Sequence, residues 1–107
     1  MEINAIELQE KIKNGEKVIV DFWAPWCGPC KILKPLFERV SEEYKRENSD
    51  IQMYTMSVEE NTEYVSSLGI RAIPTVKSFA GGSEMITRVG VLQETQIKEL
   101  ANDLING

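Results

Sequence analysis

One stretch of nine residues limits what this chain can fold into more than any other. Residues 23–31 contain both cysteines of the sequence, Cys27 and Cys30, which are separated by two residues. An apolar run ends at Trp23, and a segment with helical periodicity follows Cys30. A strand that leads through a Cys-x-x-Cys pair directly into a helix is typical of a redox site. Because Cys27 falls near the helix N-terminus, where unpaired N–H groups favour an anion, we expect a lowered thiol pKa.

The remaining pattern predicts alternating helices and strands. Residues 17–23 are expected to form a strand, whose run Val18-Ile19-Val20 is apolar without alternation, as is typical of a central strand covered on both faces. Further strands are expected over residues 51–58, 75–79 and 85–89, the last two joined by a Gly-rich hairpin turn. Helices are expected from a capping box at Asn4 and Glu7, from the cysteines to residue 47 with a kink at Pro35, and over 61–68 and 94–105. This order predicts a mixed sheet with helices on both faces.

Periodicity also predicts which apolar side chains are buried. The last helix should bury five of them, and three methionines should fill the core. The helix residues are Ile97, Leu100, Ala101, Leu104 and Ile105, and the methionines are Met53, Met56 and Met85.

Length and charge limit the class of protein. The 107 residues suffice for one domain, residues 1–107. A net charge of −5 argues against nucleic acid or an acidic membrane as a partner. No apolar run is long enough to span a membrane, and the N-terminus lacks the features of a signal peptide. We therefore expect a cytoplasmic protein, in which paired cysteines are catalytic or metal-binding more often than structural.

The chemistry open to the two cysteines is narrow. The sequence has no histidine, so Cys–His and Ser–His nucleophile pairs and imidazole metal ligands are excluded. Two sulfurs alone cannot complete a zinc or cluster site. A purely structural bridge would close almost no loop and so stabilise little. The favoured hypothesis is disulfide exchange, with Cys27 as the attacking thiolate and Cys30 as the thiol that resolves the mixed disulfide.

Asp21 is the candidate proton carrier. It lies on the apolar strand six residues before Cys27. A carboxyl buried there without a partner would have a raised pKa, which suits proton transfer near neutrality. The alternative is an ordinary hydrogen-bonded structural aspartate.

Several motifs together resemble the thioredoxin family across nearly the whole chain. They are Val20-Asp21-Phe22-Trp23-Ala24, Trp26-Cys27-Gly28-Pro29-Cys30-Lys31, Ile73-Pro74-Thr75 and Val89-Gly90. The resemblance implies an α/β thioredoxin fold, a three-layer α/β/α arrangement around a mixed sheet of four to five strands. Only residues 1–4 remain for the family's first strand, so that edge strand is expected to be minimal or missing.

The resemblance also implies roles for particular residues. Asp21 would accept the proton of Cys30, and Ile73-Pro74 would be a cis peptide facing the cysteines, with the Ile73 backbone free to pair with an extended substrate. Thr55 stands where the family usually has a lysine, so we hypothesise that Asp21 titrates higher than is usual in the family. The expected substrate-binding residues are Trp26, Gly28, Pro29, Ala72, Ile73, Pro74, Val89 and Gly90. For Trp26 a place in the core is the alternative.

A second departure lies in the strand at residues 75–79. Lys77 and Ser78 replace the apolar pair that relatives usually carry. One of them must therefore face solvent, a partner, or a polar spot in the core.

The activity implied by the resemblance is protein-disulfide reduction. No bound cofactor is needed, and the chain would be re-reduced by a thioredoxin reductase, a flavoprotein using NADPH. Disulfide-containing client proteins are the expected partners, and the chain is expected to be a monomer. With Gly28 and Pro29 between the cysteines and no histidine to stabilise the reduced thiolate, reductase is favoured over oxidase or isomerase. The alternative from another functional class is a binding subunit that holds a partner on an apolar rim around Cys27, formed by Trp26, Ala72, Ile73, Val89 and Gly90.

Overall fold

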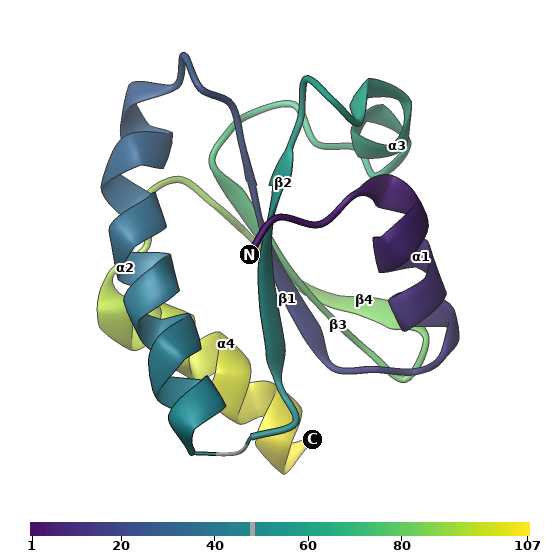
Figure 1. The fold of residues 1–107 in the computed structure, drawn as a ribbon, viewed down its shortest axis with the longest axis vertical. Coiled ribbons are helices and arrows are strands. Elements are labelled where there is room, and N and C mark those ends of the chain that lie inside the picture. The colour runs from purple at the N-terminus through teal and green to yellow at the C-terminus, as the bar shows by residue number, and fades with distance from the viewer. Residues whose placement is uncertain (48) are drawn as a thin grey trace.

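The computed structural model describes residues 1–47 and 49–107 and has three layers (Figure 1). A four-stranded mixed sheet in the order β2-β1-β3-β4 forms the middle layer, with β1 and β2 parallel and the other pairs antiparallel. Helices α1 and α3 cover one face, and α2 and α4 cover the other. The elements in chain order are α1 (Ala5–Lys13), β1 (Val18–Trp23), α2 (Gly28–Arg46), β2 (Gln52–Ser57), α3 (Thr62–Ser67), β3 (Thr75–Ala80), β4 (Ser83–Val89) and α4 (Glu94–Asn106). The predicted order and the three-layer arrangement are confirmed.

The N-terminal segment, residues 1–4, lies beside β2 where a fifth strand would be, but it is paired at one residue only. Glu2 makes a single parallel bridge with Thr55 of β2. The Thr55 N–H donates to the carbonyl of Met1 at 3.0 Å, and the Ile3 N–H donates to the carbonyl of Thr55 at 2.9 Å. Helix α1 then begins with the predicted capping box, in which Asn4 and Glu7 bond each other's backbone N–H groups. The expectation of a minimal edge strand is therefore confirmed.

Strand β1 is central, and its side chains alternate between two cores. Val18, Val20 and Phe22 pack with α1 and α3, whereas Ile19 packs with α2 and α4. The alternation of a strand places Asp21 on the same face as Ile19, under α2. All five of these residues are buried, so the carboxyl of Asp21 lies inside the protein.

The prediction of burial is wrong for two residues. Met85 is 57% exposed and Ile105 is 45% exposed. The pairing of β3 with β4 shifts at this point, so that Ser78 pairs with Ile86 and Phe79 with Glu84. Met85 is the extra residue of this bulge and has no partner across the ladder. Ile105 lies in the last turn of α4, at the margin of its buried stripe.

The bulge also explains the unusual pair Lys77 and Ser78, both of which are buried. The Ser78 hydroxyl accepts a hydrogen bond from the Ile86 N–H at 3.1 Å. The Lys77 ammonium lies 2.8 Å from a Glu84 carboxylate oxygen and donates to the Thr87 hydroxyl at 2.9 Å. Of the three expected surroundings, both residues occupy a polar spot in the core.

We predict that Ser78→Ala lowers the free energy of unfolding by about 1–3 kcal/mol, because it leaves the partly buried Ile86 N–H without its acceptor. Urea titration followed by circular dichroism measures the loss. Ser83→Ala, at an exposed position of β4, is the matched control and should change stability little. Equal stability of the Ser78→Ala variant and the parent protein would show that the side-chain acceptor does not stabilise the bulge.

Candidate active site around the Cys27–Cys30 disulfide

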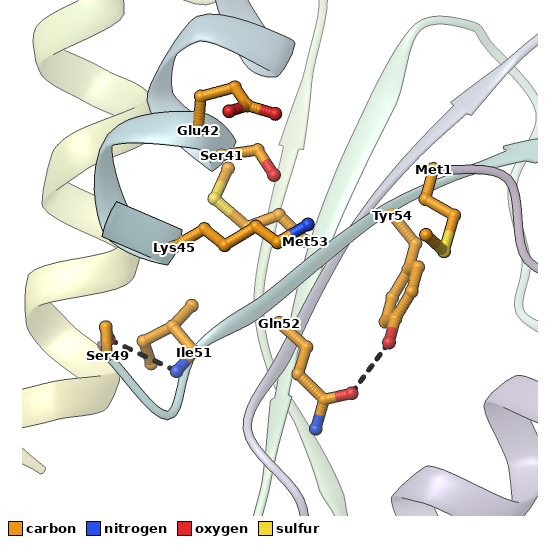
Figure 2. Close-up of a pocket in the computed structure, with 9 residues that line it drawn as sticks. All are labelled: Met1, Ser41, Glu42, Lys45, Ser49, Ile51, Gln52, Met53 and Tyr54. Carbon is orange, nitrogen blue, oxygen red and sulfur yellow. Dashed lines mark hydrogen bonds between the residues drawn. The ribbon is translucent and has the colours of Figure 1, made fainter. Parts of the chain in front are cut away.

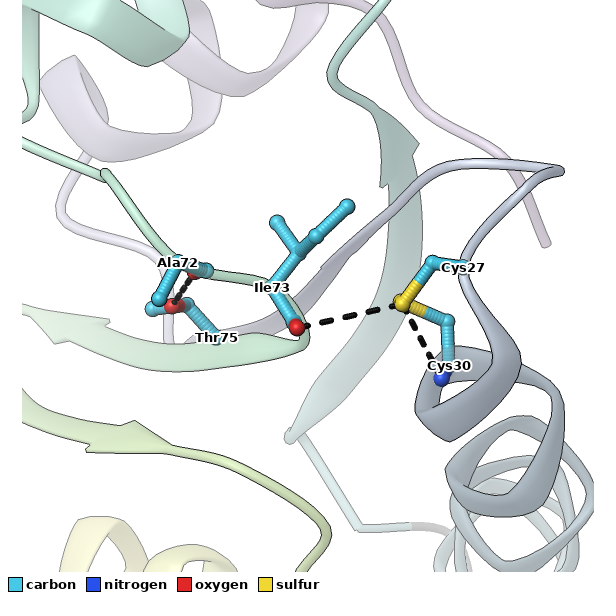
Figure 3. The surroundings of a disulfide bond; sticks show 5 residues. All are labelled: Cys27, Cys30, Ala72, Ile73 and Thr75. Carbon is cyan, nitrogen blue, oxygen red and sulfur yellow. Dashed lines mark hydrogen bonds between the residues drawn. A yellow bond between two sulfur atoms is a disulfide. The ribbon is translucent and has the colours of Figure 1, made fainter.

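The two cysteines lie where β1 passes into α2 and form a disulfide bond (Figure 3). A turn closed by the Cys27 N–H and the Ala24 carbonyl, 3.1 Å apart, brings the chain from the strand to the helix. Cys27 is the N-cap of α2, and its sulfur accepts a hydrogen bond from the Cys30 N–H at 3.2 Å. The predicted position of Cys27 at a helix N-terminus is confirmed. An N–H group aimed at the sulfur stabilises a thiolate at this position.

The two cysteines are enclosed to different degrees. Cys27 is 5% exposed and Cys30 2% exposed, while Gly28 and Pro29 between them are exposed. Both cysteines pack with Ala24 and, at the edge of this cluster, with Ile73. The disulfide is therefore close to the surface, with Cys27 the less covered of the pair.

The loop before β3 faces the disulfide. The Ile73–Pro74 peptide is cis, as the resemblance implied. The Ile73 carbonyl oxygen lies 3.8 Å from the Cys27 sulfur, and the Thr75 hydroxyl donates to the carbonyl of Ala72 and steadies the loop (Figure 3). The backbone of Ile73 thus lies directly beside the Cys27 sulfur.

The end of β4 is attached to the same loop. Val89 pairs with Thr75 across the sheet, and the Gly90 N–H donates to the Pro74 carbonyl at 2.9 Å. Gly90 has φ +100°, a conformation that side-chain-bearing residues rarely adopt. This bond brings residues 89 and 90 beside the cis-proline loop, although they follow it by fifteen positions or more in the sequence.

Exposed apolar side chains flank the disulfide. Trp26 is 68% exposed and Val89 is 64% exposed, and Ala72 is exposed as well. The exposure of Trp26 excludes the alternative in which it fills the core. Its indole N–H donates to a carboxylate oxygen of Glu59 at 3.1 Å, which fixes the ring against the loop after β2.

Asp21 is fully buried, and neither carboxylate oxygen has a hydrogen-bond partner among the described residues. Burial is the main cause that raises the pKa of Asp21, from 3.8 to about 7. The ammonium of Lys34 opposes the shift, and the carboxylates of Glu2 and Glu38 add to it. The burial and the missing partners agree with the expected raised pKa, and the alternative of a hydrogen-bonded structural aspartate does not fit this carboxyl.

Lys34 and Glu2 are residues of the site that the sequence interpretation missed. Lys34 follows Cys30 by four positions on α2 and so shares its helix face, a spacing that could have identified it. Its ammonium lies 4.6 Å from the centre of the Trp23 ring. Nothing in the sequence identifies Glu2 as a site residue, because the pairing of so short an N-terminal segment cannot be predicted from its residues.

One pocket of the described chain lies away from this chemistry. It has a volume of about 490 Å³ and lies between the C-terminal half of α2 and the start of β2 (Figure 2). At 1.5 Å per residue, its lining residue Ser41 is roughly 16 Å along the helix from Cys30. Among residues 1–47 and 49–107, no three side chains of the ligand-forming types lie together as a metal site would need. The described helices also include none that could cross a membrane.

Comparison with known proteins gives one consistent result. A family model described as thioredoxin matches residues 1–103. A thioredoxin of Rickettsia bellii is 39% identical over 97 residues, which cover 91% of this chain and 90% of the relative. A thioredoxin of Mycoplasmoides gallisepticum is 40% identical over 97 residues, covering 91% and 93%. The solved structure of oxidised mitochondrial thioredoxin 3 from Saccharomyces cerevisiae superposes with a TM-score of 0.81 at 27% identity, covering 94% of this chain and 91% of that one.

We predict that Asp21→Asn stabilises the oxidised protein at high pH. A carboxyl with a pKa of 3.8 when unfolded and about 7 when folded binds its proton more tightly in the folded state. Its burial therefore costs nothing below pH 3.8, and the cost grows until the pH passes 7, where it reaches on the order of 4 kcal/mol. Between pH 4 and pH 8, the free energy of unfolding of the Asp21→Asn variant should therefore rise relative to that of the parent protein by the same order.

Urea titrations of both proteins across this pH range measure the gain, and comparison at several pH values cancels any pH-independent effect of the amide. Asp103→Asn, at an exposed position of α4, is the control. If the stability difference between the Asp21→Asn variant and the parent did not change with pH, the raised pKa would be refuted.

Proposed function

The chain belongs to the thioredoxin family of thiol–disulfide oxidoreductases, and on this premise we propose that it reduces disulfide bonds in client proteins, with Cys27 attacking and Cys30 resolving. The observation that carries the proposal is the position of the Cys27 sulfur, at the N-terminus of α2 and 3.8 Å from the Ile73 carbonyl. A thiolate formed there is stabilised by the helix end and faces a backbone segment that can hold a substrate.

In the first step the reduced Cys27 thiolate attacks one sulfur of a client disulfide. A bond forms between Cys27 and that sulfur, the client's S–S bond breaks, and the second client sulfur leaves as a thiolate that takes a proton from water. The N–H of Cys30, which bonds the Cys27 sulfur in the oxidised chain, is placed to stabilise the attacking thiolate before the step.

In the second step Cys30 resolves the mixed disulfide. The Cys30 thiol gives its proton to the Asp21 carboxylate and attacks the Cys27 sulfur, and the first client sulfur leaves as a thiolate. Two electrons have then passed to the client, and the Cys27–Cys30 disulfide has formed. A pKa of about 7 suits Asp21 for this role, since a general base works best when its pKa is near the working pH.

Client recognition is proposed to use the backbone of Ile73 and the surrounding rim. An extended client segment would pair with the Ile73 backbone as an added strand, and its side chains would contact Trp26, Ala72 and Val89. Gly28, Pro29 and Gly90, which carry no bulky polar side chains, would allow close approach, and Pro74 would keep the loop in place. The exposure of Trp26 and Val89 supports this assignment.

The physiological partners follow from the same chemistry. We propose a thioredoxin reductase as the electron donor, so that NADPH is used only indirectly and the chain itself carries no bound cofactor. We further propose that the protein acts as a monomer in the reducing environment of the cytoplasm, where a dithiol of this kind can be maintained.

We predict that Cys30→Ser accumulates a stable mixed disulfide between Cys27 and a client protein. The variant keeps the attacking sulfur and lacks the thiol that releases the product, so turnover should stop after one attack. Incubation with oxidised insulin followed by non-reducing electrophoresis and mass spectrometry measures the adduct. Cys27→Ser is the matched control and should form none, and trapping by that variant instead would reverse the assigned roles.

We predict that Val89→Asp weakens client binding. An unpaired carboxylate in the rim should raise the KM for a protein disulfide by about tenfold, since burying a valine contributes roughly 1.5–3 kcal/mol. The rate with a small disulfide such as oxidised glutathione should change much less. Met85→Asp, exposed on the same strand but outside the rim, is the control. An unchanged KM for the Val89→Asp variant would place the client elsewhere.

A further inference from the structure

The carboxylate of Glu2 is held in place by three hydrogen-bond donors. The Trp23 indole N–H donates to Oε1 at 3.0 Å, and the Ser57 N–H donates to Oε2 at 2.7 Å. The Thr55 hydroxyl also donates to Oε1. Three donors give this side chain a defined position although the residue is exposed.

The sheet places this carboxylate beside Asp21. Thr55 is the register partner of Asp21 in the parallel pair β1–β2, and Glu2 is the bridge partner of Thr55. Register partners point to the same face of a sheet, so Asp21, Thr55 and Glu2 form a row across three adjacent segments. With neighbouring strands about 4.8 Å apart, the backbones of Asp21 and Glu2 are roughly 10 Å apart.

The groups around Asp21 come from every element that packs against it. Helix α2 contributes Lys34 and Glu38, and the N-terminal segment contributes Glu2. The register partner of Asp21 on β3 is Val76, which is uncharged. The Lys34 ammonium lies over the ring of Trp23, and the indole N–H of the same ring bonds Glu2. The ammonium of Lys34 thus attracts the Asp21 carboxylate, and the carboxylates of Glu2 and Glu38 repel it. Trp23 contacts both Lys34 and Glu2.

We propose that Glu2 is a positioning residue for the second step of disulfide exchange: its fixed carboxylate holds the Trp23 ring and makes Asp21 a stronger base toward the Cys30 thiol. The proposal rests on the proposed role of Asp21 as the acceptor of the Cys30 proton. Glu2 touches neither cysteine in this account and acts through Asp21. When the proton moves from Cys30 to Asp21, the repulsion between the two carboxylates disappears, which favours the transfer.

Charge on Glu2 can be removed with little change in shape. In Glu2→Gln the repulsion of Asp21 is lost, so the pKa of Asp21 should fall below its value of about 7. A side-chain carboxyl NMR titration of the oxidised full-length chain measures the midpoint of Asp21 directly. Glu10→Gln, an exposed glutamate of α1, removes the same charge away from the site and should leave the midpoint unchanged.

Kinetics give a second readout. With a pKa of about 7, roughly a tenth of Asp21 is ionised at pH 6. The release of client from a preformed mixed disulfide should therefore be faster at pH 6 in Glu2→Gln than in the parent, by at most about tenfold, because more Asp21 is ionised. Above pH 8, where Asp21 is ionised in both proteins, release should be slower in Glu2→Gln because its Asp21 is the weaker base, so the pH profile should shift to lower pH. Thr55→Val, which removes one donor to Glu2, should shift both readouts in the same direction and serves if Glu2→Gln does not fold.

The outcomes separate this proposal from the proposed function. A folded Glu2→Gln protein with an unchanged Asp21 midpoint overturns the role of Glu2, whatever the kinetics. If instead the midpoint shifts but Asp21→Asn releases client as fast as the parent, Glu2 acts on Asp21 as proposed while Asp21 is not the proton acceptor. A shifted midpoint together with a shifted pH profile supports both.

Discussion

The structure depends on one junction, the point where a buried strand ends and the first turn of α2 begins. The N-cap position gives the Cys27 sulfur the N–H of Cys30, and the same turn closes the Cys27–Cys30 disulfide. Because β1 is covered on both faces, its end is held rigidly, and the antiparallel pairing with β3 brings the Ile73–Pro74 loop to the same edge. The Cys27 sulfur and the Ile73 backbone that faces it are therefore positioned by the ends of two paired strands.

Much of this could be predicted from the sequence, because the signals are local. The apolar run at the start of β1, the capping box at Asn4 and Glu7 and the two cysteines each fix a conformation within a few residues. The cis peptide before Pro74 was expected only from the family resemblance, since nothing in those residues alone favours the rarer isomer.

The features that could not be predicted depend on pairing between distant segments. The expectation that Met85 is buried was wrong because alternation along β4 cannot reveal a bulge. The burial of Lys77 and Ser78 is explained by the partners found there, the Glu84 carboxylate for Lys77 and the Ile86 N–H at the bulge for Ser78. The raised pKa of Asp21 could be anticipated from its place in an apolar strand, whereas the contribution of Glu2 could not. That contribution depends on the register of a single β-bridge.

The buried carboxyl of Asp21 lowers the stability of the folded chain and at the same time makes Asp21 a usable base. A carboxylate without hydrogen-bond partners destabilises the folded chain whenever it is ionised, and a neutral residue of similar size would avoid that cost. A hydrogen-bonded carboxylate would also avoid it but would be a weak base at neutral pH, because donors stabilise the anion. Burial without a partner is the main cause that raises the pKa of Asp21 to about 7, and Lys34 and the two glutamates around it adjust that value without solvating it. The instability and the basicity of Asp21 therefore have the same origin, so one cannot be removed without loss of the other.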